Sequence, residues 1–161
     1  MPIEVERKFL VDPSKLPQPL VPERTFQLVQ GYLADDPWVR VRLIGSTGAR
    51  LTIKGTGNIS RSEFEYDIPR DDAEELLKMC KGLIRKTRHE VIFEGHKWEL
   101  DLFQDALKGL CLAEIELKAE DEAFALPPWV AKEVSNCPEY SNAQLSSTTS
   151  ASVIRFLIKG I

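Results

Sequence analysis

The sequence is poor in cysteine and histidine, and it contains no long apolar run. Its three cysteines form no CxxC pair, so a zinc ribbon or a disulfide framework is not expected. Two histidines leave little scope for imidazole chemistry, and the lack of a GxxxxGKS or GxxxxGKT motif excludes a P-loop. No apolar stretch approaches the roughly 18 residues that span a bilayer, and the N-terminus lacks the basic-then-apolar order of a signal peptide. We therefore expect a cytoplasmic protein with no membrane partner.

An excess of basic residues is also missing. The chain has 21 Lys and Arg against 25 Asp and Glu, which gives a net charge of -4. An acidic chain is a poor general binder of nucleic acid, so we expect no nucleic-acid partner. Its 161 residues, 43% of them hydrophobic, suffice for one core, and no linker or repeat divides them. The sequence predicts a single domain over residues 1–161.

Most of the chain alternates apolar and polar residues with a period of two, which is typical of β-strands. The alternation predicts eight strands, at about 3–11, 25–34, 38–44, 50–54, 62–68, 84–93, 97–103 and 111–118. Eight short strands with few helices favour a closed antiparallel barrel, because closure removes exposed sheet edges. We therefore expect a mainly β fold with peripheral helices (α+β), built on an eight-stranded antiparallel closed barrel.

Helices are expected mainly after residue 118. Asp71 or Asp72 is a candidate cap for one earlier helix that ends by Gly82. Residues 119–126 read as a short helix, and Pro127-Pro128 suits the first turn of another that runs through Val134. Residues 142–159 read as a last helix whose Ser/Thr-rich middle lowers helix propensity. The strands thus occupy about 3–118 and a helical segment about 119–161.

The polar face of the predicted strands is unusually rich in charge. One face of the segments carries eight acids, namely Glu4, Glu6, Glu63, Glu65, Glu99, Asp101, Glu114 and Glu116. The same faces carry eight bases, namely Lys8, Arg40, Arg42, Lys54, Arg61, Lys86, Arg88 and Lys118. Alternation alone allows two arrangements. The charges face solvent around an apolar centre, as sheets commonly do, or they line a wet lumen whose apolar outer faces are covered.

Three features favour the lumen. The bases recur as Arg-x-Arg and Lys-x-Arg, and the acids recur as Glu-x-Glu pairs. Like charges two residues apart on one strand face repel one another, so a solvated surface gains nothing from them. Arginine forks bind phosphate oxygens bidentately, whereas paired carboxylates bind hard cations such as Mg²⁺ or Mn²⁺. A lumen that holds both sets suits a metal-bound polyphosphate.

The opening residues Ile3-Glu4-Val5-Glu6-Arg7-Lys8-Phe9-Leu10 resemble the Glu-x-Glu-x-Lys signature of the CYTH superfamily, the triphosphate tunnel metalloenzymes. Further stretches match in order, namely Gln30-Gly31-Tyr32-Leu33, Arg40-Val41-Arg42, Thr52-Ile53-Lys54, Arg61-Ser62-Glu63-Phe64-Glu65, Lys86-Thr87-Arg88, Trp98-Glu99-Leu100-Asp101, Ala113-Glu114-Ile115-Glu116 and Tyr140-Ser141-Asn142. The resemblance covers roughly residues 3–145. The chain departs from some members at Ala143, where they carry a basic residue.

The resemblance implies a tunnel barrel with a charged lumen that hydrolyses inorganic triphosphate with Mg²⁺ or Mn²⁺, as in the short bacterial triphosphatases. It implies metal ligands at Glu4, Glu6, Glu114, Glu116 and Asp101. It implies phosphate contacts from Lys8, Arg40, Arg42, Lys54, Arg61, Lys86 and Arg88. It implies catalytic roles for Glu63 and Glu65, which orient water or hold a second cation, and for Lys8 and Tyr32.

Two alternatives stay open on the sequence. One is an enzyme that acts on a nucleotide or on thiamine triphosphate, including a class IV adenylate cyclase. The other is a non-catalytic module that binds polyphosphate. In each case the partner is a small anionic molecule, and a homodimer is compatible with the pattern.

Overall fold

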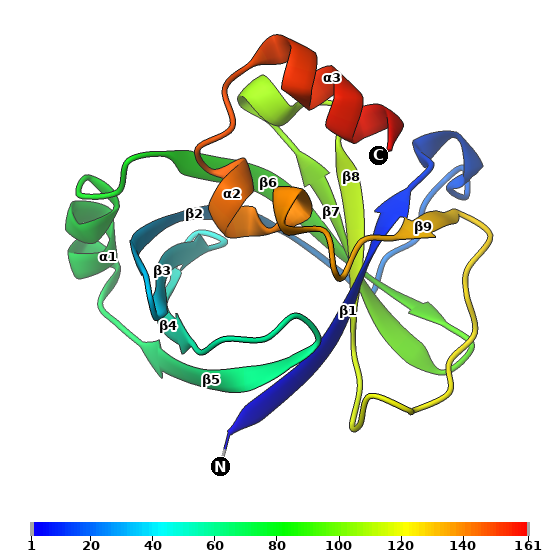
Figure 1. The fold of residues 1–161 in the computed structure, drawn as a ribbon, viewed down its shortest axis with the longest axis horizontal. Coiled ribbons are helices and arrows are strands. Elements are labelled where there is room, and N and C mark those ends of the chain that lie inside the picture. Colours follow the sequence, from blue (N-terminus) through cyan, green and yellow to red (C-terminus); the bar gives the residue numbers. More distant parts are fainter. Residues whose placement is uncertain (1, 161) are drawn as a thin grey trace.

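A computed structural model of the chain describes residues 2–160. Eight strands follow one another as predicted, with boundaries within a few residues of those expected. They are β1 (Ile3–Val11), β2 (Arg24–Asp35), β3 (Trp38–Ile44), β4 (Gly48–Lys54), β5 (Ser60–Asp67), β6 (Leu83–Phe93), β7 (His96–Phe103) and β8 (Cys111–Glu116). Figure 1 shows these strands curving around a common centre. The predicted mainly β fold is confirmed.

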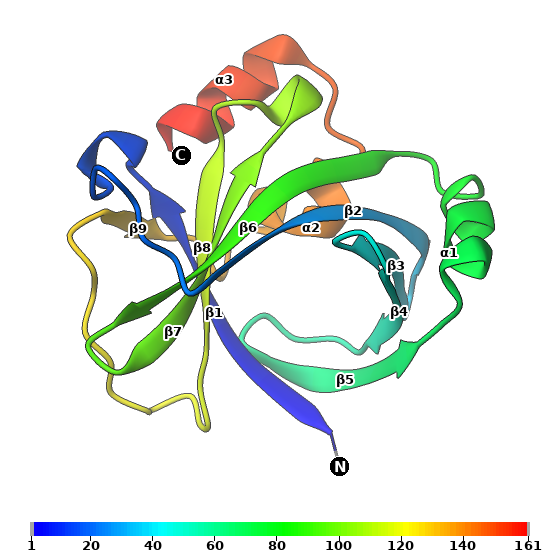
Figure 2. The same cartoon turned by 180° about the vertical axis from the view of Figure 1, so that it is seen from behind.

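The strands pair in the order β5-β4-β3-β2-β6-β7-β8-β1, and β5 also pairs with β1. This last pairing is antiparallel, places Glu4 opposite Arg61 and closes the barrel. A ninth strand, β9 (Val130–Glu133), lies beside the end of β1, where Phe9 is opposite Glu133. One edge of β1 is therefore shared by β5 at its start and β9 at its end (Figure 2).

Helices lie outside the barrel wall or over one end of it (Figure 1). They are α1 (Arg70–Leu77), α2 (Asn142–Leu145) and α3 (Ala151–Lys159), with 3₁₀ turns at Pro13–Lys15, Asp105–Leu107 and Pro138–Tyr140. Pro69 occupies the N-cap of α1, so Asp71 and Asp72 lie in the first turn rather than at the cap. Within residues 2–160, no helix has the length and apolar character needed to cross a membrane.

The segment after β8 differs from the predicted series of helices. Residues 119–126 form turns and irregular chain, and the helix expected from Pro127-Pro128 is replaced by β9. The helix expected over 142–159 is broken into α2 and α3. Its Ser/Thr-rich middle explains the break, since the hydroxyls of Ser146, Ser147 and Thr148 donate to backbone carbonyls one turn back. Such bonds compete with a regular helix.

Most of the outer apolar surface of the barrel is covered, although Phe64 and Tyr66 of β5 are exposed. On one side, Ala73 and Leu77 of α1 pack against Val41 of β3 and Ala49 of β4. On the other side, a cluster centred on the buried Trp98 joins the outer faces of β1, β7 and β8 with the segment that leads to β9. Because burying apolar surface is the main driving force for folding, these outer contacts explain why the charged faces turn inward.

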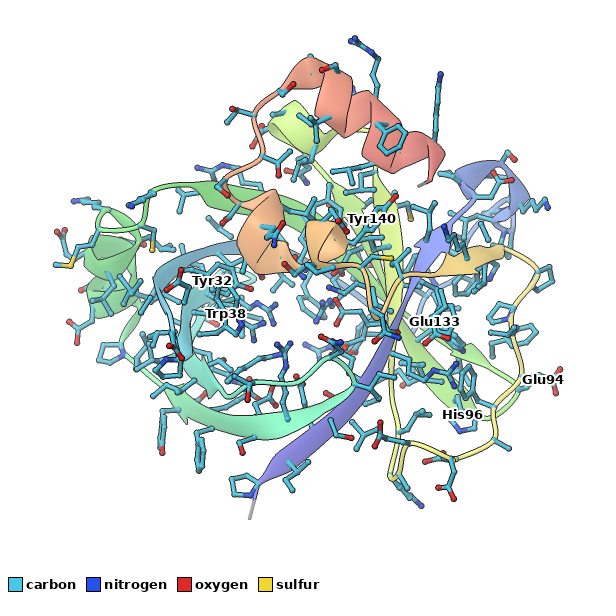
Figure 3. The ribbon with its side chains drawn as sticks, in the orientation of Figure 1. Tyr32, Trp38, Glu94, His96, Glu133 and Tyr140 are labelled. Carbon is cyan, nitrogen blue, oxygen red and sulfur yellow. The ribbon has the colours of Figure 1, made fainter. Side chains whose placement is uncertain are left out.

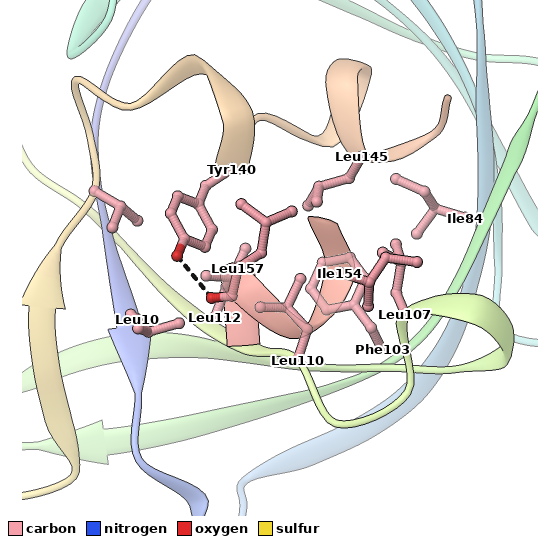
Figure 4. Packing of buried hydrophobic residues seen from close by; sticks show 11 residues of the cluster. Leu10, Ile84, Phe103, Leu107, Leu110, Leu112, Tyr140, Leu145, Ile154 and Leu157 are labelled. Atoms are coloured by element: carbon pink, nitrogen blue, oxygen red, sulfur yellow. Dashed lines mark hydrogen bonds between the residues drawn. The ribbon is translucent and has the colours of Figure 1, made fainter. Parts of the chain in front are cut away.

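One end of the barrel is filled by apolar side chains rather than charges. The inward faces of β1, β6, β7 and β8 end in Leu10, Ile84, Phe103 and Leu112. These side chains pack against residues of the C-terminal segment, namely Tyr140, Leu145, Ile154 and Leu157 (Figure 4). The Tyr140 hydroxyl donates a hydrogen bond to the carbonyl oxygen of Leu157 at 2.6 Å. The C-terminal segment therefore closes this end with a buried apolar cluster.

Candidate active site

The barrel encloses a cavity of about 400 Å³. It is lined by most of the residues that the sequence indicated, namely Glu4, Glu6, Lys8, Tyr32, Arg40, Arg42, Lys54, Arg61, Glu63, Glu65, Arg88, Glu114 and Glu116. Figure 3 shows side chains with nitrogen and oxygen ends gathered in the space that the strands surround. Of the two arrangements that alternation allowed, the structure has the charged lumen.

Strand register explains how residues far apart in sequence meet in this cavity. Glu6 of β1 lies opposite Glu116 of β8, and Lys8 lies opposite Glu114. Because successive side chains of a strand alternate between faces, an inward Glu6 carries Glu4 and Lys8 inward with it. The same rule carries Glu114 and Glu116 to the lumen together.

Acidic side chains gather in two overlapping groups at β1, β7 and β8. Carboxylate oxygens of Glu4, Glu6 and Glu116 lie within 4.8 Å of one another, and so do those of Glu6, Glu99 and Glu114. Burial and the neighbouring charges of Glu114 and Glu4 raise the pKa of Glu6 well above its usual value. Burial and the charges of Glu99 and Glu4 also raise the pKa of Glu116.

These crowded carboxylates fit a hard divalent cation. Oxygen donors in this number are what Mg²⁺ and Mn²⁺ prefer. The pKa values of Glu6 and Glu116 are raised, whereas Lys8 and Arg88 overcome burial and hold the pKa of Glu114 well below its usual value. The negative charge that lacks a basic partner is therefore at Glu6 and Glu116. A cation held between Glu4, Glu6 and Glu116, or between Glu6 and Glu114, would relieve that repulsion.

Glu4 also belongs to a mixed cluster with β4 and β5. Lys54 Nζ donates to Glu4 Oε1 at 2.8 Å, and Arg61 Nε donates to the same oxygen at 2.9 Å. Burial opposes ionisation of Glu4, but the charge of Lys54 and the hydrogen bonds from Glu63, Lys54 and Arg61 together outweigh it and lower the Glu4 pKa to about 2. Glu63 lies 3.1 Å from Lys54 Nζ, yet burial and the contact with Glu4 raise its pKa to about 7. At neutral pH Glu4 is therefore ionised, whereas its neighbour Glu63 can take up or release a proton.

Arginines of β3 face the acidic groups across the lumen. Arg42 Nε donates to Gln30 Oε1 at 2.7 Å, and burial with the charges of Arg40 and Arg88 lowers the Arg42 pKa to about 9. Arg40 contacts Thr52 at 3.2 Å, and its buried Nε has no hydrogen-bond partner among residues 2–160. Crowded guanidinium groups with spare donors are suited to an anion that accepts several hydrogen bonds.

Lys8 and Tyr32 line the same cavity from β1 and β2. Lys8 Nζ lies 3.8 Å from Glu114 Oε1 and donates to the Tyr140 carbonyl at 3.2 Å. Tyr32 packs edge-on against Trp38, with ring centroids 5.9 Å apart (Figure 3). Lys8 therefore connects the acidic group to the C-terminal segment, whereas Tyr32 sits beside the arginines of β3.

Three residues of the predicted charged faces do not line the cavity. Lys86 and Asp101 are on the expected faces but are fully enclosed, with 0% and 1% exposure. The Asp101 carboxylate is occupied by Arg88 and Lys86 and belongs to neither carboxylate group. This geometry argues against the predicted metal contact of Asp101 and the predicted phosphate contact of Lys86. Lys118 follows the end of β8 and is exposed.

Sequence reasoning missed several charged residues at the cavity. Glu90 of β6 lies between Arg24 Nη1 at 3.5 Å and Lys97 Nζ at 3.2 Å, and all three line the lumen. Glu90 continues the phase of Lys86 and Arg88, so the alternation could have identified it. Asn142, which belongs to a stretch that resembles the family but had no predicted role in the site, also lines the cavity, from the start of α2. No strand pattern could place Asn142, because it lies outside the barrel strands.

Comparisons with known proteins agree with this geometry. The CYTH domain family matches residues 2–150. The inorganic triphosphatase of Acetivibrio thermocellus is 41% identical over 147 residues, which is 88% of this chain and 92% of that protein. The inorganic triphosphatase of Nitrosomonas europaea is 36% identical over 150 residues, which is 89% of this chain and 96% of that protein.

A solved structure shows the same fold. The crystal structure of the inorganic triphosphatase NE1496 superposes with a TM-score of 0.65 and 34% identity, covering 90% of this chain and 95% of that chain. The closed barrel, its charged lumen and a family match over nearly the whole length lead to one assignment. The chain belongs to the CYTH domain family.

Proposed function

We propose that this protein hydrolyses inorganic triphosphate to pyrophosphate and phosphate, with a divalent cation. The observation that carries the proposal is the composition of one cavity, in which crowded carboxylates face crowded guanidinium groups. A polyphosphate and a cation that bind together balance both sets of charges. The two relatives described above are inorganic triphosphatases, and the sequence match covers most of their length. They support the same reaction.

The basic side chains hold the phosphate chain. Arg40, Arg42 and Arg88 offer guanidinium forks toward the lumen, while Lys54 and Arg61 supply further positive charge beside Glu4. Lys8 donates to a phosphate oxygen near the acidic group, and Tyr32 donates to one beside the arginines of β3. Preorganised donors of this kind stabilise charge that develops on phosphate oxygens in the transition state.

Glu4, Glu6, Glu114 and Glu116 hold the divalent cation, which we propose to be Mg²⁺ or Mn²⁺. When bound, the cation neutralises phosphate charge and acidifies water. Asp101 and Lys86 take no direct part, because they lie behind the cavity wall.

The reaction is an in-line attack of water on a terminal phosphorus. The water oxygen forms a bond to phosphorus as the bond to the bridging oxygen breaks, and pyrophosphate leaves. Glu63 and Glu65 line the cavity; they orient the water and take up its proton. No covalent intermediate forms.

The proposal also covers the domain organisation, the location and the assembly of the protein. Residues 1–161 act as one domain, and the protein works in the cytoplasm on a small anionic substrate without nucleic acid or membrane. A homodimer is compatible with it.

A substrate panel tests the proposed function. Purified protein is incubated in Mg²⁺ or Mn²⁺ with inorganic triphosphate, ATP or thiamine triphosphate, and phosphate, pyrophosphate and cyclic AMP are measured. We expect phosphate and pyrophosphate from inorganic triphosphate, and ¹⁸O from labelled water in the released phosphate. Cyclic AMP from ATP would select a cyclase, whereas tight triphosphate binding without turnover would select a binding module. Phosphate released without label would contradict direct attack by water.

A further inference from the structure

Arg88 lines the cavity, and two carboxylates hold its guanidinium group in place. Its Nε donates to Asp101 Oδ1 at 2.7 Å and its Nη2 donates to Asp101 Oδ2 at 2.8 Å. Its Nη1 donates to Glu99 Oε2 at 2.9 Å. A bidentate carboxylate fixes both the plane and the direction of a guanidinium group. Asp101, which does not line the cavity, therefore determines how Arg88 enters it.

Lys86 shares the same carboxylate. Its Nζ donates to Asp101 Oδ2 at 2.6 Å and to Asn142 Oδ1 at 3.0 Å, and it lies 5.4 Å from the centre of the Phe103 ring. The side chain has no exposed surface and does not line the cavity. Burying an ammonium group costs several kcal/mol unless it is well paired. Here the pairing joins the barrel wall to the C-terminal segment.

The C-terminal segment is itself held on its other side. Tyr140, two residues before Asn142, is fully buried in the apolar cluster, and its hydroxyl bonds to Leu157 of α3 (Figure 4). Ser141 caps α2 by accepting a hydrogen bond from the backbone N–H of Gln144 at 3.2 Å. Asn142 therefore has little freedom to move away from Lys86.

We propose that Lys86 is a positioning residue that couples the C-terminal segment to Arg88 through Asp101. It does not contact the phosphate chain. Without the Lys86 ammonium group, Asn142 Oδ1 and Asp101 Oδ2 each lose a hydrogen-bond donor, so the carboxylate that orients Arg88 is no longer fixed to the C-terminal segment. This inference rests on the proposed function, because its effect is on how the clamp holds triphosphate.

Matched variants of Lys86 test the role. Lys86→Met and Lys86→Gln both remove the positive charge, but the glutamine amide still donates hydrogen bonds to Asp101 and Asn142. We expect Lys86→Met to lower kcat/KM for triphosphate about 10- to 100-fold, since misplaced groups cost rates of that order. Lys86→Gln should recover a substantial part of that loss. Equal losses in the two variants would show that the positive charge of Lys86, and not its hydrogen bonds to Asp101 and Asn142, supports activity and would overturn the proposal.

A double-mutant cycle with Asn142→Leu tests the link to the C-terminal segment. Residues that act through one contact have non-additive effects, so Lys86→Met/Asn142→Leu should be no worse than Lys86→Met alone. Multiplied losses would contradict the coupling. A lower melting temperature with unchanged kcat and KM in all variants would make the network purely structural and would also overturn the proposal.

Calorimetric binding of triphosphate separates this inference from the proposed function. If wild-type protein does not hydrolyse triphosphate, the proposed function fails. The inference about Lys86 is then tested by the dissociation constant for triphosphate, which should rise most in Lys86→Met and less in Lys86→Gln. Lys86→Met retains the charge-balanced pair of Arg88 and Asp101, so we expect it to fold. If Lys86→Met does not fold, Lys86→Gln and Asn142→Leu replace it in the test. We expect both to weaken triphosphate binding, and unchanged binding in both would contradict the proposal.

Discussion

At the scale of the residue, the lumen places like charges next to each other on both of its sides. Arg42 has its pKa lowered to about 9 by burial and by two other arginines, while Glu6 has its pKa raised by burial and by two other glutamates. Neither set is favourable alone, because like charges repel more strongly where water is scarce. The side chains are therefore arranged for ligands rather than for the stability of the empty protein.

Glu116 gives the cleanest test of the metal site. It contributes to one carboxylate group but forms no ion pair with residues 2–160, whereas Glu4 is paired with Lys54 and Arg61. We expect Glu116→Gln to lower metal-dependent turnover about 100-fold without loss of folding. Glu4→Gln should abolish turnover but also destabilise the protein. Activity and melting temperature are compared with those of Glu120→Gln, an exposed control; unchanged activity in Glu116→Gln would contradict the assignment.

Arg40 tests the phosphate clamp. Its buried Nε has no hydrogen-bond partner within the described chain, so a phosphate oxygen is the acceptor that it lacks. We expect Arg40→Ala to raise KM for triphosphate about 10- to 100-fold, the loss typical of a charged hydrogen bond, with a smaller change in kcat. Arg85→Ala is the matched control, because Arg85 lies on the outer face of β6 and pairs with Asp105. Similar KM values for both variants would contradict a role of Arg40 in binding.

At the scale of the element, β1 joins the parts of the site. It carries Glu4, Glu6 and Lys8 inward while pairing with β5, β8 and β9. Its outward Arg7 donates from Nε to Glu133 Oε2 of β9 at 2.8 Å and stacks 4.9 Å from the centre of the Phe124 ring. This outer contact fixes β9 and the segment before it on the barrel.

Glu133→Gln should lower the free energy of unfolding by about 1 kcal/mol, as expected for a partly exposed ion pair. The hydrogen bonds from Arg7 lower the pKa of Glu133, so the pair stabilises the protein above the unfolded pKa and this contribution is lost as the pH falls through the folded pKa. Denaturation with urea at neutral pH and below about pH 4 measures both effects. Glu139→Gln, an exposed control, should not change stability. Equal stability of wild type and Glu133→Gln at neutral pH would contradict this account.

Alternation was sufficient to predict the barrel strands, because successive side chains of each strand point alternately to the lumen and to the outer wall, which gives the sequence a clear period of two. It could not predict β9, whose four residues are too few to show a period and follow two prolines that suggested a helix. The same limit applies to the site. The period of two identifies the strand face on which Lys86 and Asp101 lie. It does not show whether they reach the cavity, because that depends on the C-terminal segment that packs over them.

At the scale of the whole molecule, the barrel is closed around charge and plugged at one end by an apolar cluster. The closure places the carboxylates of β1 and β8 and the arginines of β3 around a single cavity. The apolar cluster ties α2 and α3 to that cavity through Asn142. Fold stability and ligand binding are therefore linked through the same strands.

Divalent cations should stabilise the folded protein. A ligand that binds only the native state raises the free energy of unfolding with its concentration, and a cation relieves repulsion among the carboxylates. We expect the melting temperature to rise as Mn²⁺ is added to wild type, and to rise much less in Glu116→Gln. Chelation with EDTA should reverse the rise. A melting temperature that does not respond to Mn²⁺ would contradict the metal site.

The most direct test of the central claim is phosphate release from inorganic triphosphate by the purified protein as Mg²⁺ or Mn²⁺ is titrated. The account predicts no turnover in EDTA, turnover that saturates with the cation, and equal amounts of pyrophosphate and phosphate as products. Cation-independent turnover, or none at any cation concentration in protein that binds triphosphate, would contradict it.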